Sequence, residues 1–120
     1  MSETDILRRI LRDLGARPDL RLWRQSSGVG RALHNDAVVR FGIPGCADLS
    51  GIITHQRCVF GCQVDLGVRL EIEVKTPTRR QSKQQVAFQA MIEKFGGVYI
   101  LCRSTEDALT QLRDRGYCLK

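Results

Sequence analysis

The sequence predicts an α/β fold, a single domain spanning residues 1–120 in which a mixed sheet of four to five strands is flanked by helices. Three patterns support this class. Apolar residues recur at helical spacing from Glu3 to about Leu14, and they alternate with polar residues at 70–75, as in a half-buried strand. Val98–Cys102 is a continuous apolar run, typical of a central strand covered on both faces. A chain of 120 residues suffices for one hydrophobic core.

The first helix is expected to run from Glu3 to about Leu14. Ser2 is a suitable N-cap with Asp5 three residues later, and Gly15 ends the pattern. Asp5 should face solvent, whereas Glu3 falls on the inward side. The buried stripe comprises Ile6, Leu7, Ile10, Leu11 and Leu14.

Leu20–Gln25 is the next predicted strand, with Leu20 and Leu22 on one face. Residues 28–31, Gly-Val-Gly-Arg, are expected to form a loop. This Gly-x-Gly lacks the third glycine and the following helix of a dinucleotide fold, so no nucleotide cofactor is predicted.

Ala37–Phe41 is predicted as a further strand that ends before a turn at Pro44–Gly45, a pair that fits the central positions of a type II turn. The turn should place Asp48 at or near the start of the next strand, Leu49–Ile53. Residues 54–67 have two interpretations: they complete a hairpin with the strand before them, or they form a separate strand ahead of 68–75.

The strand at 68–75 has one apolar and one polar face. Leu70, Ile72 and Val74 project one way, and Glu71, Glu73 and Lys75 project the other. If this strand neighbours Leu49–Ile53, then Asp48 and Glu73 converge with Lys75 beside them.

Such a group suits a divalent-cation nuclease. Mg²⁺ prefers oxygen ligands and keeps several waters, so Asp48, Glu73 and the backbone carbonyl of Val74 would supply enough protein ligands. Lys75, near two carboxylates and a phosphate, is expected to stay charged, to orient the attacking water and to stabilise charge on phosphorus.

After Lys75, Thr76-Pro77-Thr78 stops the strand, and a basic cluster follows at Arg79, Arg80 and Lys83. The cluster either meets a phosphate backbone or is a solvated face. Ser82 and Gln85 resemble a capping box that opens a helix through Lys94. Its apolar side is predicted to comprise Val86, Phe88, Met91, Ile92 and Phe95.

Gly96-Gly97 ends that helix before the apolar strand Val98–Cys102. Ser104 is expected to cap a last helix from Thr105 to about Arg115, with Asp107 completing a box. Residues 117–120 are too few to assign to an element.

Nineteen basic against thirteen acidic residues give a formal net charge of +6. This charge suits a polyanionic partner, although an ordinary basic protein would also show it. No run approaches the roughly 18 apolar residues of a membrane span, and the N-terminus has no signal-like apolar block, so we expect an intracellular, cytoplasmic protein.

The five cysteines are Cys46, Cys58, Cys62, Cys102 and Cys118. An odd count without a secretory signal argues against a disulfide framework. Cys58 and Cys62 have a spacing that a zinc site can use, but no second pair of ligands follows them, so thiols are the expected state.

Several motifs together resemble the VRR-NUC (virus-type replication-repair nuclease) domain of the PD-(D/E)xK nuclease superfamily. They are Gly45-x-x-Asp48-Leu49, Glu73-x-Lys75, Gln85-x-x-Phe88 and Gly96-Gly97, preceded by Trp23-Arg24 and Ser27-Gly28. Each motif alone is weak, so the resemblance depends on their order and spacing. It extends from the first helix to Ser104. It implies a restriction-endonuclease-like core.

The resemblance also implies an activity and roles for residues. Standalone members are associated with Mg²⁺-dependent cleavage of branched DNA, particularly four-way junctions, as homodimers that leave 5′-phosphate ends; Mn²⁺ would substitute. In this pattern Gln85 assists catalysis. Glu3 joins the metal site or its surroundings, or else only complements the helix dipole. Arg24 and Ser27 contact phosphates, although Arg24 would also suit a solvated strand. A phage or bacterial origin would fit.

Two other functions remain open from the sequence. The chain could be a non-catalytic basic DNA-binding module whose acidic residues are structural. It could instead be a sequence-specific, restriction-type nuclease of the same superfamily, although so small a domain offers little room for base-reading elements and favours recognition of DNA shape.

Overall fold

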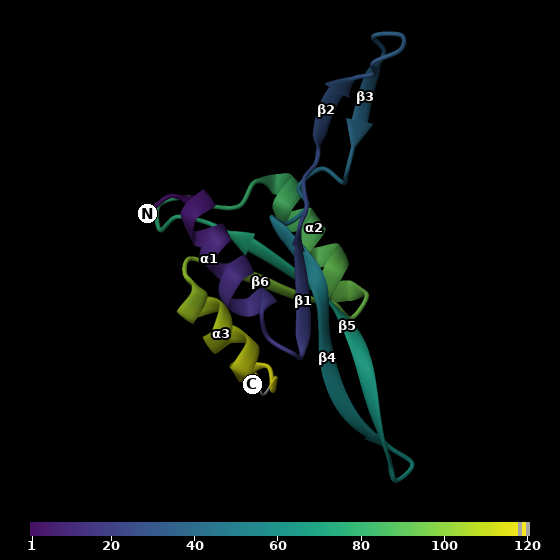
Figure 1. Ribbon diagram of the computed structural model, residues 1–120, viewed down its shortest axis with the longest axis vertical. Coiled ribbons are helices and arrows are strands. Elements are labelled where there is room, and N and C mark those ends of the chain that lie inside the picture. Colours follow the sequence, from purple (N-terminus) through teal and green to yellow (C-terminus); the bar gives the residue numbers. More distant parts are fainter. Residues whose placement is uncertain (118, 120) are drawn as a thin grey trace.

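A four-stranded mixed sheet forms the centre of the computed structural model, which describes residues 1–117 and 119 (Figure 1). In chain order the elements are α1 (Glu3–Gly15), β1 (Leu20–Arg24), β2 (Gly28–Arg31), β3 (Val38–Phe41), β4 (Leu49–Val59), β5 (Cys62–Val74), α2 (Lys83–Lys94), β6 (Val98–Cys102) and α3 (Thr105–Asp114). The predicted α/β class and mixed sheet are therefore confirmed.

The strand order in the sheet is β1-β4-β5-β6. β4 runs antiparallel to both β1 and β5, whereas β6 runs parallel to β5, with α2 as the crossover between them. The prediction that Val98–Cys102 is a central strand is wrong, since β6 lies at the edge. Its apolar run arises because helices cover both of its faces.

The two faces of the sheet have different cores. On one face α1 and α3 pack against Leu70, Ile72 and Val74 of β5, all fully buried. On the other face Phe88 and Ile92 of α2 pack with Tyr99 of β6 and Ala47. The polar alternates of β5 therefore lie on the face that α2 covers, which removes them from bulk water.

The helix starts largely match the expected caps. Capping boxes form at Ser2 with Asp5 and at Ser82 with Gln85, as predicted. In α3, Ser104 is the N-cap, but the Asp107 carboxylate accepts from the backbone N–H of Arg103, so the predicted box is wrong. No helix in the described part of the chain is long and apolar enough to span a membrane.

The predicted apolar side of α2 is only partly correct. Phe88 and Ile92 are buried, whereas Val86, Met91 and Phe95 are exposed. In the sheet α2 packs mainly against the edge strand β6, so only a narrow stripe of the helix, with Phe88 and Ile92, is covered.

Residues 54–67 form a hairpin, the first of the two interpretations. β4 and β5 pair continuously from Leu49 with Ile72 to Val59 with Cys62. Phe60 and Gly61, both with positive φ, make the turn. The far half of this pair, Thr54–Gly67, projects from the molecule as a two-stranded ribbon (Figure 1). Cys58 and Cys62 are exposed thiols there, and Cys118 lies outside the described residues.

The prediction of a loop at residues 28–31 is wrong. These residues form β2, which pairs with β3 in a separate two-stranded sheet that we call the arm. The predicted strand at Ala37–Phe41 exists as β3, but it lies in the arm and not in the central sheet. The Phe41 ring lies against Gly28, which compensates for the missing side chain. The glycines at 28 and 30 favoured a loop in the sequence, but hydrogen bonding to β3 makes this segment a strand.

Candidate metal and active site

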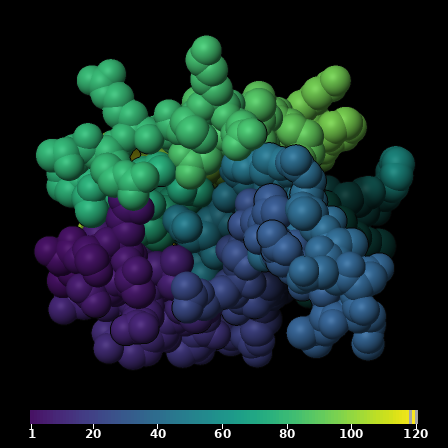
Figure 2. All heavy atoms as spheres, turned by 90° about the horizontal axis from the view of Figure 1, so that it is seen from above, coloured from purple at the N-terminus to yellow at the C-terminus, as the bar shows by residue number. Residues whose placement is uncertain are grey.

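One end of the sheet brings the predicted site residues together. β1, β5 and β6 finish at this end and β4 begins there, so their terminal residues share one edge. We call it the polar end. In the view from above (Figure 2), the start of α1 (purple), the segment around residues 76–90 (green) and the arm (blue) border it.

Asp48 lies immediately before β4, as predicted. Leu49 pairs with Ile72, and continuing this antiparallel register by one residue sets Asp48 opposite Glu73. The Asp48 Oδ2 atom accepts from the backbone N–H of Val74 at 2.8 Å. Burial raises the pKa of Asp48, and this hydrogen bond opposes the rise.

Glu73 is a buried carboxylate, and among the described residues only one of its two oxygens accepts a hydrogen bond. Its Oε1 atom accepts from Gln85 Nε2 at 2.9 Å and lies 3.7 Å from Lys75 Nζ. Its Oε2 atom is buried without a hydrogen-bond partner among the described residues. Burial, followed by the negative charge of Asp48, raises the pKa of Glu73 to about 7. An unpartnered buried carboxylate oxygen is costly unless something else binds it.

These donors fit a hard divalent cation. A residue in a strand directs its N–H and C=O to the same side, and the Val74 N–H points to Asp48, so the Val74 carbonyl also faces that edge. Oε2 of Glu73, the Asp48 carboxylate and this carbonyl are oxygen ligands of the kind that Mg²⁺ prefers. No three His, Cys, Asp or Glu side chains within the described residues form a metal-binding group.

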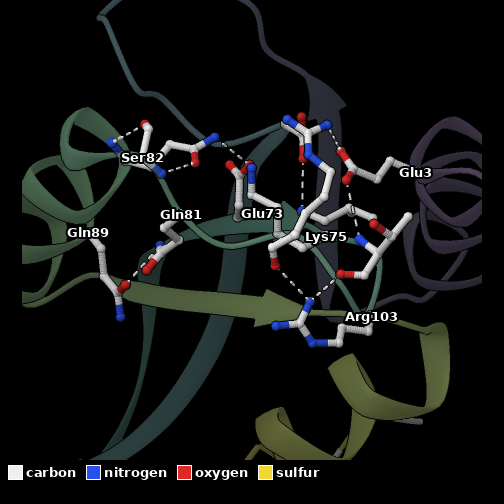
Figure 3. Close-up of polar contacts among 12 residues, drawn as sticks. Glu3, Glu73, Lys75, Gln81, Ser82, Gln89 and Arg103 are labelled. Atoms are coloured by element: carbon white, nitrogen blue, oxygen red, sulfur yellow. Dashed lines mark hydrogen bonds and ion pairs between the residues drawn. The ribbon is translucent and has the colours of Figure 1, made fainter.

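Lys75 is buried beside Glu73, and the segment that follows it is tied down from three sides (Figure 3). Glu3 of α1 accepts from the Thr76 N–H at 3.2 Å and from Arg79 Nη1 at 3.2 Å. Both oxygens of Glu3 thus bind protein donors, and its direct contacts hold this segment to α1.

Two further tethers come from β6 and α2. Arg103, just past β6, donates to the carbonyl oxygens of Thr76 and Arg79. Gln81 donates to Gln89 at 3.0 Å (Figure 3). It also donates to the Tyr99 hydroxyl at 3.2 Å. These hydrogen bonds tie the chain that follows Lys75 to α1, α2 and the end of β6, and such support favours the preorganised geometry that a site needs.

Glu71 is a buried carboxylate that the sequence interpretation did not assign to the site. Ser50 Oγ, Arg69 Nε and Gln25 Nε2 donate to it at 3.1, 2.7 and 3.3 Å. The backbone N–H of Gln25 in turn donates to the Asp48 carbonyl at 2.9 Å. Glu71 thus fixes Gln25, and Gln25 holds Asp48. The sequence did contain a signal for this role, because strand alternation places Glu71 on the same face as Glu73.

The predicted DNA contacts lie at the polar end. Arg24 ends β1, Ser27 leads into the arm, Lys83 begins α2, and Arg79 and Arg80 lie between β5 and α2; all five are exposed. Arg79 is paired with Glu3. Positive charge therefore surrounds the two carboxylates.

The site thus combines oxygen ligands for a cation, a buried amine next to them and a basic rim. Such an arrangement can hold a metal ion against a phosphate and stabilise charge on that phosphate. Gln85 donates to Glu73, whereas its neighbour Gln84 is exposed. The chain matches no protein-family model, no curated protein and no solved structure.

Proposed function

We propose that this protein is a Mg²⁺-dependent endodeoxyribonuclease that cuts branched DNA, with Mn²⁺ as a substitute metal. One observation carries the proposal. Glu73 is buried beside Asp48 and Lys75, and its Oε2 atom has no hydrogen-bond partner among the residues that the structure describes. A purely structural carboxylate would be satisfied by protein donors, as Glu71 is.

Each residue has a role in the proposed hydrolysis of a phosphodiester bond. Asp48, Glu73 and the Val74 carbonyl would hold the metal ion, which when bound supplies Lewis acidity and an activated water. Lys75 orients the attacking water and stabilises negative charge on the phosphate. Gln85 holds Glu73 in place through its hydrogen bond.

Branch selectivity is proposed on the size and charge of the domain. The basic residues at the polar end are suited to phosphates, which report the shape of DNA but carry no sequence information. Two copies related by a twofold axis would present two sites and so cut two strands of a four-way junction. The protein would then act as a structure-selective homodimer.

The test is cleavage of a labelled four-way junction beside a linear duplex of the same sequence, with Mg²⁺, Mn²⁺ or EDTA. We expect symmetric, metal-dependent cuts in the junction, and a loss of at least about 100-fold in rate for Lys75→Ala. Lys94→Ala, at the far end of α2, is the control and should cut like the wild type.

Three outcomes would contradict the proposal in different ways. Equal cutting of duplex and junction would remove the branch selectivity. Discrete fragments from long duplex DNA would indicate a restriction-type nuclease. Binding without cutting under every metal would indicate a DNA-binding module.

A further inference from the structure

The face of the sheet on which α2 lies is covered over only part of its width. α2 packs mainly against the edge strand β6 and leaves the β1 and β4 side of this face open. Trp23 of β1 and Ile52 of β4 lie there, 46% and 49% exposed. On the opposite face, Leu20 and Ile53 of the same two strands are buried in the core with α1 and α3. An exposed tryptophan beside an exposed aliphatic side chain is typical of a binding surface.

The strand register sets the side chains of this region next to one another. Arg21, Ile52 and Arg69 form one cross-strand row, because Ile52 pairs with both arginines. Trp23, opposite Ser50, begins the next row toward the polar end. We call Arg21, Trp23, Ile52 and Arg69 together the open face. It presents an aromatic ring and an aliphatic side chain between two guanidinium groups.

The charge of the open face is positive. Arg21 and Arg69 are both exposed, and Arg24, exposed at the end of β1, adds a third guanidinium group nearby. Arg21 donates to backbone carbonyl oxygens and forms no ion pair within the described part of the chain. Glu71, the carboxylate that pairs with Arg69, is fully buried. An anionic ligand lying here would therefore meet guanidinium groups and an exposed ring.

The open face leads into the candidate site. Gln25, two residues after Trp23, donates to Glu71 through its side chain and to the Asp48 carbonyl through its backbone N–H. With about 3.3 Å per residue along a strand and about 4.8 Å between strands, the backbone of Trp23 lies about 12 Å from that of Glu73. At about 3.4 Å per nucleotide or more, this distance spans a few nucleotides of one DNA strand.

We infer that the open face holds an unpaired stretch of DNA, with a base stacked on Trp23 and the backbone beside Arg21 and Arg69. Inside a duplex each base is covered by its neighbours, whereas an unpaired base can lie flat on an aromatic ring. Ile52 extends the apolar surface on which the strand would lie. The inference rests on the proposed function and deepens it, because it names unpaired nucleotides next to a branch point as the DNA that the protein holds beside its site.

Trp23 is the only tryptophan of the chain, so tryptophan fluorescence reports on the open face alone. The protein is titrated in EDTA with an oligothymidylate and, separately, with a fully paired duplex of the same length. Anisotropy of labelled DNA measures binding in parallel. We expect the oligothymidylate to quench the emission as it binds and the duplex to bind without quenching. Binding of the oligothymidylate without quenching would overturn the inference, as would a failure to bind it.

Substitutions of Trp23 measure how much stacking contributes to affinity. Trp23→Leu should weaken binding of the single strand at least about fivefold and leave duplex binding unchanged. Trp23→Phe keeps a ring and should retain most of the affinity, which separates stacking from a loss of structure. Phe95→Leu, at an exposed aromatic residue at the end of α2, is the matched control and should bind like the wild type. Unchanged single-strand binding by Trp23→Leu, or equal weakening for single strand and duplex, would refute the inference.

The inference and the nuclease proposal can fail separately, because both binding measurements are made in EDTA. Quenching by the oligothymidylate without cleavage of any DNA under any metal would support the open face and contradict the nuclease. Metal-dependent cleavage of the junction by a protein whose tryptophan is never quenched would support the nuclease and overturn the role of the open face.

Discussion

Glu73 is the residue at which the chemistry of the candidate site is concentrated. Its carboxylate is buried and faces Asp48, and one of its oxygens has no partner in the described part of the chain, so its ionisation is unfavourable without a compensating cation. Lys75 compensates in part from 3.7 Å. A metal ion would complete the compensation, which makes metal binding and proton release by Glu73 linked events.

Removing this charge should change stability in a pH-dependent way. The pKa of Glu73 rises from 4.5 to about 7 on folding, so its favourable contribution is full below pH 4.5 and is lost as pH rises through 7. Glu73→Gln should therefore raise the free energy of unfolding in EDTA at pH 8 by up to about 3 kcal/mol, with little gain at pH 5. Urea denaturation measures both values. The exposed Glu106→Gln is the control, and equal effects of Glu73→Gln at the two pH values would refute the linkage.

At the scale of elements, the start of α2 positions the site. Ser82 accepts from the Gln85 N–H, the Gln85 side chain accepts from the Ser82 N–H, and the same amide donates to Glu73. The capping box therefore fixes both the helix and the orientation of the amide. A motif that usually serves stability here also orients a metal-ligand candidate.

Two N-cap variants separate these roles. Ser82→Ala and Ser104→Ala each remove an N-cap and should each lower the free energy of unfolding by about 1 kcal/mol. Only Ser82→Ala should also slow junction cleavage, by about tenfold, because the Ser82 hydroxyl holds Gln85, which donates to Glu73, whereas Asp107 in α3 accepts from Arg103. Cleavage kinetics and denaturation of both variants provide the comparison. Equal cleavage rates in the two would show that the Ser82 hydroxyl is not needed to position Gln85.

At the scale of the whole molecule, positive charge and protruding apolar surface lie on different parts of the chain. The net charge of +6 favours approach to a polyanion, and the basic rim directs that attraction to the polar end. The arm, with little net charge, extends from the same end. The arm and the ribbon at Thr54–Gly67 both project from the body, and they give this small chain a large accessible surface.

The electrostatic part of the proposed DNA binding can be measured by its dependence on salt. Arg80 is exposed at the polar end, so Arg80→Gln should weaken binding to all DNA sequences alike and reduce the slope of log K against log salt by about 1. Arg113→Gln, on α3, should change neither. Fluorescence anisotropy in Ca²⁺, which is expected to prevent cleavage, gives both quantities. An unchanged slope for Arg80→Gln would exclude a phosphate contact there.

Local patterns in the sequence determined most elements and the members of the site. Helical spacing and capping residues predicted α1, α2 and α3. The alternation at residues 70–75 predicted that Leu70, Ile72 and Val74 of β5 lie in the hydrophobic core. Asp48, Glu73, Lys75 and Gln85 could be selected because their chemistry and order are visible in one dimension. Such signals are local, since each depends on a few neighbouring residues.

Tertiary structure decided what depends on distant partners. Only the strand order shows that β6 is an edge strand, that Gly28–Arg31 pairs with β3 and that the arm lacks cover. Only the fold buries Glu71 and leaves one oxygen of Glu73 unpartnered. Burial and pairing are properties of segments far apart in the chain, so no local pattern encodes them, and they separate a satisfied carboxylate from one available to a metal ion.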